Sequence, residues 1–225
     1  MNQPSKSAPA SATDSGYAPR ERGLIRRDRI LDAATEVFMQ YGYEAASLQE
    51  IVSRAGGSLA TLYRLFGNKE GLFQSMIERK SLHLLEELDL PHVSGKDPQT
   101  VLYNVGMRFL DVVLSQDALS LHRLLIAESG RNPRLREIFL ETAPERSTKA
   151  VADYLESQVK AGRLALEDCS LAAGQFLSML KGSYHMRSLM GEEIVLADDE
   201  RERVVRHAIQ LFLRGCGNAT PHNHT

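Results

Sequence analysis

The chain has 225 residues, of which 43% are hydrophobic and 25% charged, and its formal net charge is −2. These values are typical of a globular protein with a sizeable core, and they argue against indiscriminate nucleic-acid binding through bulk positive charge. The sequence has no apolar run long enough to cross a membrane, and its start, MNQPSKSAPASATDSGYAP, has no apolar segment typical of a secretory signal. Two cysteines, Cys169 and Cys216, favour reduced thiols in a cytoplasmic protein; an oxidation sensor is the alternative.

Residues 1–22 are rich in Ser, Ala and Pro and are predicted to form a disordered arm. A cluster of arginines follows, including Arg26 and Arg27 at the start of the first predicted helix. Arginines near a helix N-terminus oppose the helix dipole unless a phosphate lies close, so these two are candidate DNA contacts. A solvated arm paired with neighbouring acidic residues is the alternative. The first helix carries apolar residues at helical spacing and is predicted to end at Gly42.

Residues 47–72, SLQEIVSRAGGSLATLYRLFGNKEGL, predict two short helices joined by a glycine turn. Ser47 followed by Glu50 forms a capping box that starts the first helix. Ser58 is the expected N-cap of the second, which runs from Leu59 to Phe66. Two short helices across a tight turn form a helix-turn-helix, whose second helix can enter a DNA major groove.

The second helix of this motif is expected to expose small and hydrogen-bonding groups first, then a phenol and a cation one turn later. That order suits base edges first and phosphates second. Lys69 falls in the first turn of the next helix, where the dipole disfavours a cation unless a phosphate docks there; neutralisation by Glu70 is the alternative. The candidate DNA contacts of this region are Ser47, Ser58, Leu59, Ala60, Thr61, Tyr63, Arg64 and Lys69.

Residues 24–72 resemble the DNA-binding domain of the TetR family of bacterial transcription regulators, and the stretch GGSLATLYRLFGNKEGLF carries the resemblance. Two positions depart from the family pattern. Gly57 stands where a branched apolar residue is usual, which would loosen the turn. Leu59 stands where a lysine or arginine is common, so a contact would be lost or become an apolar contact with a thymine methyl.

The rest of the chain shows no β alternation, so an all-α fold is predicted. A long helix from Lys69 to about Leu88 is expected to connect the two domains. Further helices are predicted over residues 98–115, 118–129, 134–141, 144–161, 168–189 and 198–214. The predicted domains are a helix-turn-helix domain over 23–72 and an effector-binding and dimerisation domain over 73–216, followed by a disordered tail over 217–225.

The last two predicted helices look like a dimer interface, a four-helix bundle formed across two chains. Small residues recur every four positions in the first of them, which lets another helix approach closely. The alternative is purely internal packing. The candidate interface residues are Ala173, Gly174, Ser178, Gly182, Val205, Ala208 and Phe212.

Residues 119–182 resemble the effector domain of the AefR-type subgroup, which implies a homodimer that admits a small apolar ligand. Methionine and aromatic side chains adapt to irregular ligands, and a plain core position is the alternative for each candidate. The candidate effector contacts are Phe109, His122, Leu125, Phe176, Met179 and His185. Two histidines without a carboxylate at metal spacing are a poor metal site, so neither metal nor cofactor is predicted.

These features together predict a homodimeric DNA-binding regulator, in which two recognition helices fit successive major grooves of a palindromic operator. Repression relieved by a small apolar effector is the expected mode, with the connecting helix carrying the change. Two alternatives come from other classes of protein. One is an enzyme, against which stands the lack of a Gly-rich phosphate loop, HExxH or G-x-S-x-G motif. The other is a helical interaction module without DNA-binding activity.

Overall fold

A computed structural model describes residues 17–88 and 97–215, and all regular elements within these ranges are helices. The predicted tail over 217–225 lies outside the described residues, as does most of the predicted arm. Residues 17–22, expected in that arm, instead begin the first helix. The helices are α1 (Tyr17–Ala45), α2 (Leu48–Ala55), α3 (Leu59–Phe66), α4 (Lys69–Leu88), α5 (Pro98–Val113), α6 (Gln116–Ser129), α7 (Pro133–Thr142), α8 (Pro144–Lys160), α9 (Cys169–Leu189) and α10 (Asp198–Gly215).

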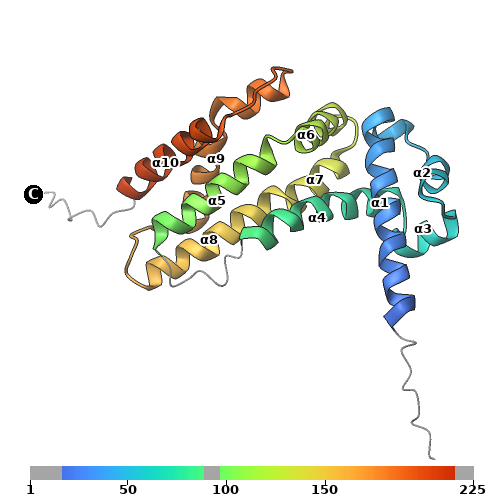
Figure 1. The fold of residues 1–225 in the computed structure, drawn as a ribbon, viewed down its shortest axis with the longest axis horizontal. Coiled ribbons are helices and arrows are strands. Elements are labelled where there is room, and N and C mark those ends of the chain that lie inside the picture. The colour runs from blue at the N-terminus through green and yellow to red at the C-terminus, as the bar shows by residue number, and fades with distance from the viewer. Residues whose placement is uncertain (1–16, 89–96, 216–225) are drawn as a thin grey trace, which may run out of the picture.

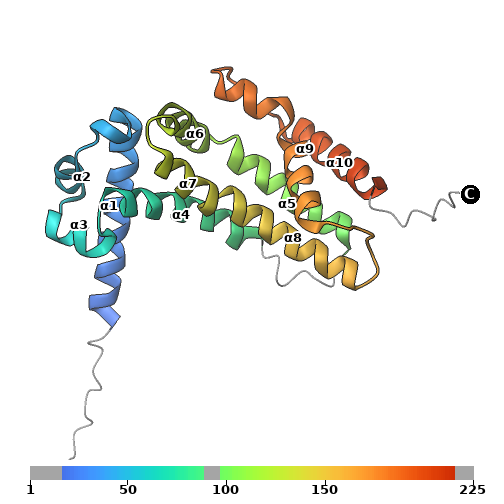
Figure 2. The same cartoon turned by 180° about the vertical axis from the view of Figure 1, so that it is seen from behind.

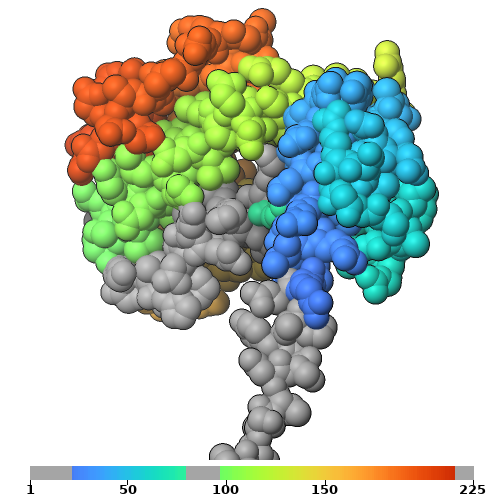
Figure 3. Space-filling model, turned by 45° about the vertical axis from the view of Figure 1, so that its right-hand side comes forward, coloured from blue at the N-terminus to red at the C-terminus, as the bar shows by residue number. Residues whose placement is uncertain are grey.

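The molecule is elongated, with α1, α2 and α3 at one end and α5, α8, α9 and α10 in the body (Figure 1). Helix α4 leaves the first group and runs alongside α7 and α8, as the opposite view also shows (Figure 2). Helix α6 packs against α1, and the yellow-green atoms of the body meet the blue atoms of the first helix there (Figure 3). The described part of the chain is therefore an N-terminal head joined to a helical body by α4, α6 and α7.

Two hydrophobic clusters hold this arrangement. The body core is built from α5, α8, α9 and α10, with Phe176 and Phe212 in contact at a ring-centroid distance of 5.1 Å. The head core includes α1 to α4, and it extends into the body through buried residues of α6 and α7, namely Leu121, Leu125, Leu135 and Ile138. Because apolar burial is the main favourable term in folding, this shared core ties the head to α6 and α7.

Helix α5 is apolar on most sides because it lies between α9 and α10 on one side and α4 on the other. A methyl group on Gly106 would lie 2.8 Å from Val205 Cγ1, so α5 and α10 approach closely at this glycine. Four polar side chains lie along one side of α5 and just beyond its end: Asn104, Arg108, Asp111 and Ser115. Its Asp111 forms an ion pair with Arg201 of α10, and Ser115 caps α6 by accepting from the N–H of Ala118 (3.2 Å).

Two glycines interrupt helices. Gly42 (φ 78°) bends the end of α1, where the sequence predicts that the helix stops. Gly182 (φ 48°) interrupts α9. Glycine is required there by the positive φ and not by close contact with another helix, which corrects the assignment of Gly182 to a row of small residues that lets a helix approach. A Cβ on Gly174 would meet only Thr148 Cγ2, at 4.0 Å, so tight packing does not require glycine at that position either.

Candidate nucleic-acid interface and ligand cavity

The turn between α2 and α3 is built from local hydrogen bonds. The Ser47 hydroxyl accepts from the N–H of Glu50 (3.5 Å), and α2 ends at Gly56 in the left-handed conformation (φ 65°). The N–H of Gly57 donates to the carbonyl of Val52 (2.8 Å), which completes a Schellman-type stop. A Cβ at Gly57 would meet nothing within 4 Å, so the missing branched side chain leaves the stop itself intact.

Helix α3 has one buried side and one exposed side. The Ser58 hydroxyl accepts from the N–H of Thr61 (3.3 Å), and Leu62 and Phe66 are buried in the head core. The side chains of Ser58, Ala60, Tyr63 and Arg64 are exposed, with Tyr63 at 50%. Leu59 is half-buried and packs against the head core, so its side chain is only partly available for a thymine methyl.

A groove of about 300 Å³ lies between the first part of α1 and the end of α3. It is lined by Arg22, Gly23, Arg26, Arg64 and Leu65, and we call it the arginine groove. Three of these five residues are arginines and none is acidic, a composition that suits a phosphate backbone. Arg27 is not part of it, because its guanidinium lies over the ring of Phe66, 5.6 Å from the centroid.

Lys69 begins α4, but its ammonium lies at the C-terminal end of α1. The ammonium donates to the carbonyl of Glu44 (3.0 Å) and lies 4.8 Å from the ring centroid of Tyr43. A helix C-terminus stabilises a cation, which offsets its unfavourable position at the start of α4. Burial lowers the pKa of Lys69, and the charges of Glu44 and Glu128 oppose that shift. The ammonium therefore has protein partners that neither sequence interpretation anticipated, and its contact with phosphate stays a prediction.

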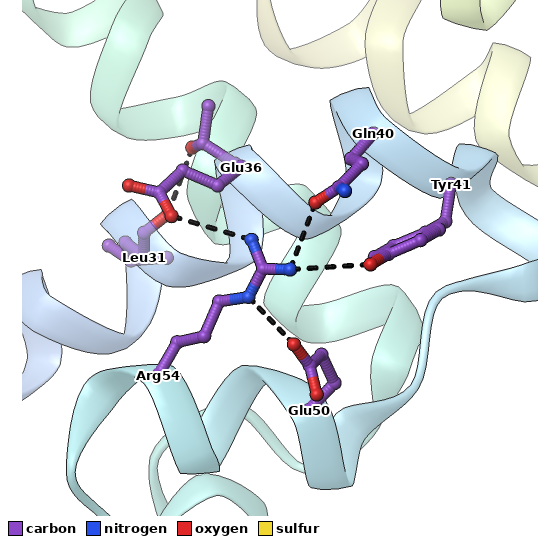
Figure 4. A network of polar contacts seen from close by, with 7 residues as sticks. Leu31, Glu36, Gln40, Tyr41, Glu50 and Arg54 are labelled. Atoms are coloured by element: carbon purple, nitrogen blue, oxygen red, sulfur yellow. Dashed lines mark hydrogen bonds and ion pairs between the residues drawn. The ribbon is translucent and has the colours of Figure 1, made fainter.

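Arg54 was not a sequence candidate, although it fixes the position of α2. Its guanidinium bonds Glu50 Oε1 (2.8 Å) on its own helix and Gln40 Oε1 (2.9 Å) on α1 (Figure 4). Glu36 and Tyr41 complete the network from α1, at 3.6 and 3.5 Å. The i, i+4 spacing of Glu50 and Arg54 could have predicted their ion pair from the sequence, whereas the partners on α1 could be identified only from the structure.

The body contains a partly open cavity of about 550 Å³ lined by residues from α4 to α9. This volume lies within the range of roughly 300–1,000 Å³ that is usual for small-molecule sites. Most of its lining is apolar, from residues such as Phe109, Val112, Val113, Leu121, Leu125, Ile126, Phe139 and Leu177. Ile77 of α4 also lines it, so the cavity touches the helix that leaves the head.

Polar side chains of the lining come from α6 to α9, and the two histidines and Lys181 lie on α6 and α9. His185 Nε2 and His122 Nδ1 are 3.1 Å apart, and the His122 ring packs edge-on against Phe139. Burial, and secondarily the charges of His185 and Lys181, lower the pKa of His122 to about 4. Burial also lowers the pKa of His185 and of Lys181. The described residues hold no group of three or more His, Cys, Asp or Glu that could bind a metal ion.

Four of the six candidate effector residues line the cavity: Phe109, His122, Leu125 and His185. Phe176 does not, because it is fully buried in the body core against Phe212. Met179 does not either, since it is exposed on α9 outside the cavity lining. Sequence reasoning missed Lys181 and Arg136, which line the cavity. The i, i+4 spacing of Lys181 and His185 was the only available signal for the former.

The candidate interface residues fall into three groups. Ala173, Val205, Ala208 and Phe212 are buried in the core of their own chain, which corrects their assignment to a surface between chains. Gly174 and Ser178 line the cavity, although Ser178 is also exposed. Gly182 is exposed at the kink of α9. The prediction failed because the spacing of small residues shows that they share one face of a helix. It does not show whether that face packs inside its own chain or against a second chain.

A capped recognition helix, exposed beside a positive groove and joined to a ligand-sized cavity, defines the chain as a helix-turn-helix DNA-binding regulator. No helix among the described residues is long and apolar enough to cross a membrane. Comparisons with known proteins identify the family of regulators. The model of the family described as bacterial regulatory proteins, tetR family, matches residues 30–76. The model of the AefR-like transcriptional repressor C-terminal domain matches residues 100–217.

The relatives are of the same kind. The HTH-type transcriptional regulator YvkB of Bacillus subtilis (strain 168) is 25% identical over 193 residues, which cover 83% of this chain and 95% of YvkB. The repressor ComR of Escherichia coli (strain K12) is 44% identical over 72 residues, covering 30% of this chain and 34% of ComR. The structure of the flavonoid-responsive regulator FrrA is 30% identical, covers 86% of this chain and 98% of its own, and superposes with a TM-score of 0.74.

The chain therefore belongs to the TetR family of bacterial transcription regulators, and it has an AefR-like C-terminal domain. It is a DNA-binding transcription regulator, and the comparisons support this assignment over the helical interaction module. The predicted all-α fold, with an N-terminal helix-turn-helix and a C-terminal helical domain, is confirmed.

Proposed function

We propose that the protein is a cytoplasmic homodimeric repressor that binds a palindromic operator and leaves it when a small, largely apolar molecule enters the cavity. The observation that carries this proposal is the exposed side of α3 next to the arginine groove. The described AefR-like domain belongs to repressors, which favours repression over activation. Binding rather than turnover is the expected activity.

On the DNA, α3 would lie in the major groove. Ser58, Ala60 and Thr61, at its N-terminus, would face base edges, while Tyr63 and Arg64 would contact the backbone. Arg26, in the arginine groove, would contact phosphates beside the same major groove.

The partner surface would be formed by α9 and α10. Leu171, Met179, Met186 and Leu211 are large apolar side chains of these two helices that remain exposed in a single chain. An exposed apolar surface of this kind marks an association site. A twofold-related copy would cover it and would place the two α3 helices roughly 34–36 Å apart, the spacing of successive major grooves.

Release from DNA would follow from residues that the cavity and the head share. Ile77, Leu121 and Leu125 line the cavity and also belong to the head core. A molecule in the cavity therefore touches side chains that hold the head in place. If it binds better to a form with the heads turned or spread, operator affinity falls by that difference, typically about 1–3 kcal/mol.

The test is a mobility-shift titration with the DNA upstream of the protein's own gene. Wild-type protein should retard this DNA in preference to a random duplex of equal length. Thr61→Val should change which sequences bind, whereas Tyr63→Ala should weaken binding to both DNAs alike, because base contacts specify and backbone contacts position. If neither this DNA nor any fragment enriched from the genome is bound selectively, the proposed function is wrong.

A further inference from the structure

The cavity lining has an unusual balance of charge. Lys181 and Arg136 are its two basic side chains, His122 and His185 contribute imidazoles, and the lining contains no Asp or Glu. An apolar cavity with basic groups and no carboxylate in its lining favours a ligand that carries a negative charge.

Lys181 differs from the other lysines whose side chains are described. Lys149 pairs with Asp153 (2.8 Å), Lys160 pairs with Glu156 (3.5 Å), and Lys69 is held at the end of α1. Within the described ranges, no carboxylate lies within ion-pair distance of the Lys181 ammonium, which is half-buried in the cavity wall. A charge removed from water without a partner is costly, so the ammonium would gain from an anion beside it.

The two histidines add a hydrogen-bond donor to the cavity. Each neutral imidazole carries one N–H, and one of these two is used in the contact of 3.1 Å between the rings. Whichever ring donates, the other keeps its own N–H. The pair therefore offers one further donor next to Lys181, whose charge acts on both histidines.

We propose that the cavity binds an amphipathic organic acid, whose carboxylate is held by Lys181 and the histidine pair and whose apolar body packs against the Phe109 side of the lining. This inference rests on the proposed function, because it names the chemical class of the effector. A carboxylate has acceptors for the ammonium and for the free imidazole N–H together. The apolar remainder of the ligand replaces water against a wall that is mostly aliphatic and aromatic.

The experiment is calorimetric titration of the full-length protein, without DNA, with straight-chain fatty acids of about six to fourteen carbons and with the alcohols and amines of equal length. The best acid should bind roughly ten- to a hundredfold more tightly than its matched alcohol, the usual effect of a hydrogen bond to a charged group. The amine should be the weakest of the three. Equal affinity for acid and alcohol, a preference for the amine, or no acid binding across the series would overturn the proposal.

Substitutions locate the effect. Lys181→Met keeps most of the length of the side chain and removes the charge, so it should abolish the preference for acid over alcohol while retaining alcohol binding. Lys181→Arg should keep the preference. Lys149→Met, on the exposed face of α8, is the matched control and should behave like wild type. An unchanged preference in Lys181→Met, or loss of the preference in Lys149→Met, would contradict the assignment.

Failure of this inference can be separated from failure of the proposed function. A mobility shift measured with and without the best acid reports the regulatory step independently. Acid binding without any effect on the DNA complex would overturn acid-triggered release and leave the cavity assignment standing. Selective DNA binding by a protein that binds no acid would overturn the assignment of the cavity to an organic acid and leave the proposed DNA-binding function standing.

Discussion

Single residues determine the geometry of the turn before the recognition helix and the pKa values of buried side chains. Gly56 and Gly57 are adjacent, yet they have different constraints. Gly56 has a φ of 65°, whereas Gly57 has open space around its missing Cβ and no left-handed backbone. Burial lowers the pKa of His122 in the cavity and also that of Lys69 in the head.

Gly57→Ala should increase the free energy of unfolding by about 0.4–1 kcal/mol, because alanine restricts the unfolded chain and fits this position. The matched variant Gly56→Ala should decrease it by about 1–2 kcal/mol, because alanine is strained in the left-handed conformation. Urea denaturation followed by circular dichroism measures both. Equal losses in the two variants would show that the turn is not built as described.

The histidine pair predicts a loss of stability in acid. The unfolded chain protonates His122 near its ordinary pKa of 6.5, whereas the folded chain does so only near about 4. The folded state is therefore favoured above pH 6.5, and this contribution, at most about 3 kcal/mol, is lost as the pH falls towards 4. Urea denaturation from about pH 7.5 to about pH 5 should show this loss in wild type and less of it in His122→Gln. The exposed control His207→Gln should follow wild type; an identical pH profile in His122→Gln would contradict the prediction.

At the scale of helices, the predictable features were the local ones. The caps Ser47 and Ser58 each make the expected hydrogen bond, and the bounds of α2 and α3 follow from them and from the glycines. Features that depend on which helices meet were not predictable. Gly106 gave no signal that α10 would approach it, and the small residues of α9 suggested a partner chain instead of the cavity.

Gly106→Ala tests the close approach of α5 and α10. Its added methyl would lie 2.8 Å from the stiff Val205 side chain, so overpacking should cost about 1–3 kcal/mol. Gly174→Ala is the control, since its methyl has room and alanine is favoured over glycine in a helix by about 1 kcal/mol. Thermal unfolding should therefore shift down in the first variant and slightly up in the second. A stabilised Gly106→Ala would mean that α5 and α10 are farther apart.

At the scale of the whole molecule, the head and body are one packed unit. The head core continues into α6 and α7, and Ile77 places α4 in the cavity wall. The sequence predicted α4 as the connection, but it did not show that α6 shares in it. Glu128 of α6 faces the end of α1, with one carboxylate oxygen 3.2 Å from the position of a Cβ on Gly42.

Pairing of two chains is the first prediction at this scale. Met186 and Leu211 are 60% and 51% exposed on α9 and α10. Replacing both with Glu should convert the dimer to monomers, because buried carboxylates without partners are costly. Leu140→Glu, at an exposed position of α7, is the control and should remain dimeric. Light scattering coupled to size-exclusion chromatography gives the mass; a dimer of the double variant would exclude this face as the interface.

We expect the exposed side of α3 and the arginine groove to meet the DNA backbone. The most direct test is the salt dependence of DNA affinity, measured by fluorescence anisotropy for wild type, for Arg26→Ala with Arg64→Ala, and for the control Arg131→Ala, an exposed arginine between α6 and α7. Each lost phosphate contact should reduce the slope of log K against log salt by about 1, so the double variant should lose about 2. A slope equal to that of wild type and Arg131→Ala would show that these two arginines do not contact DNA phosphates.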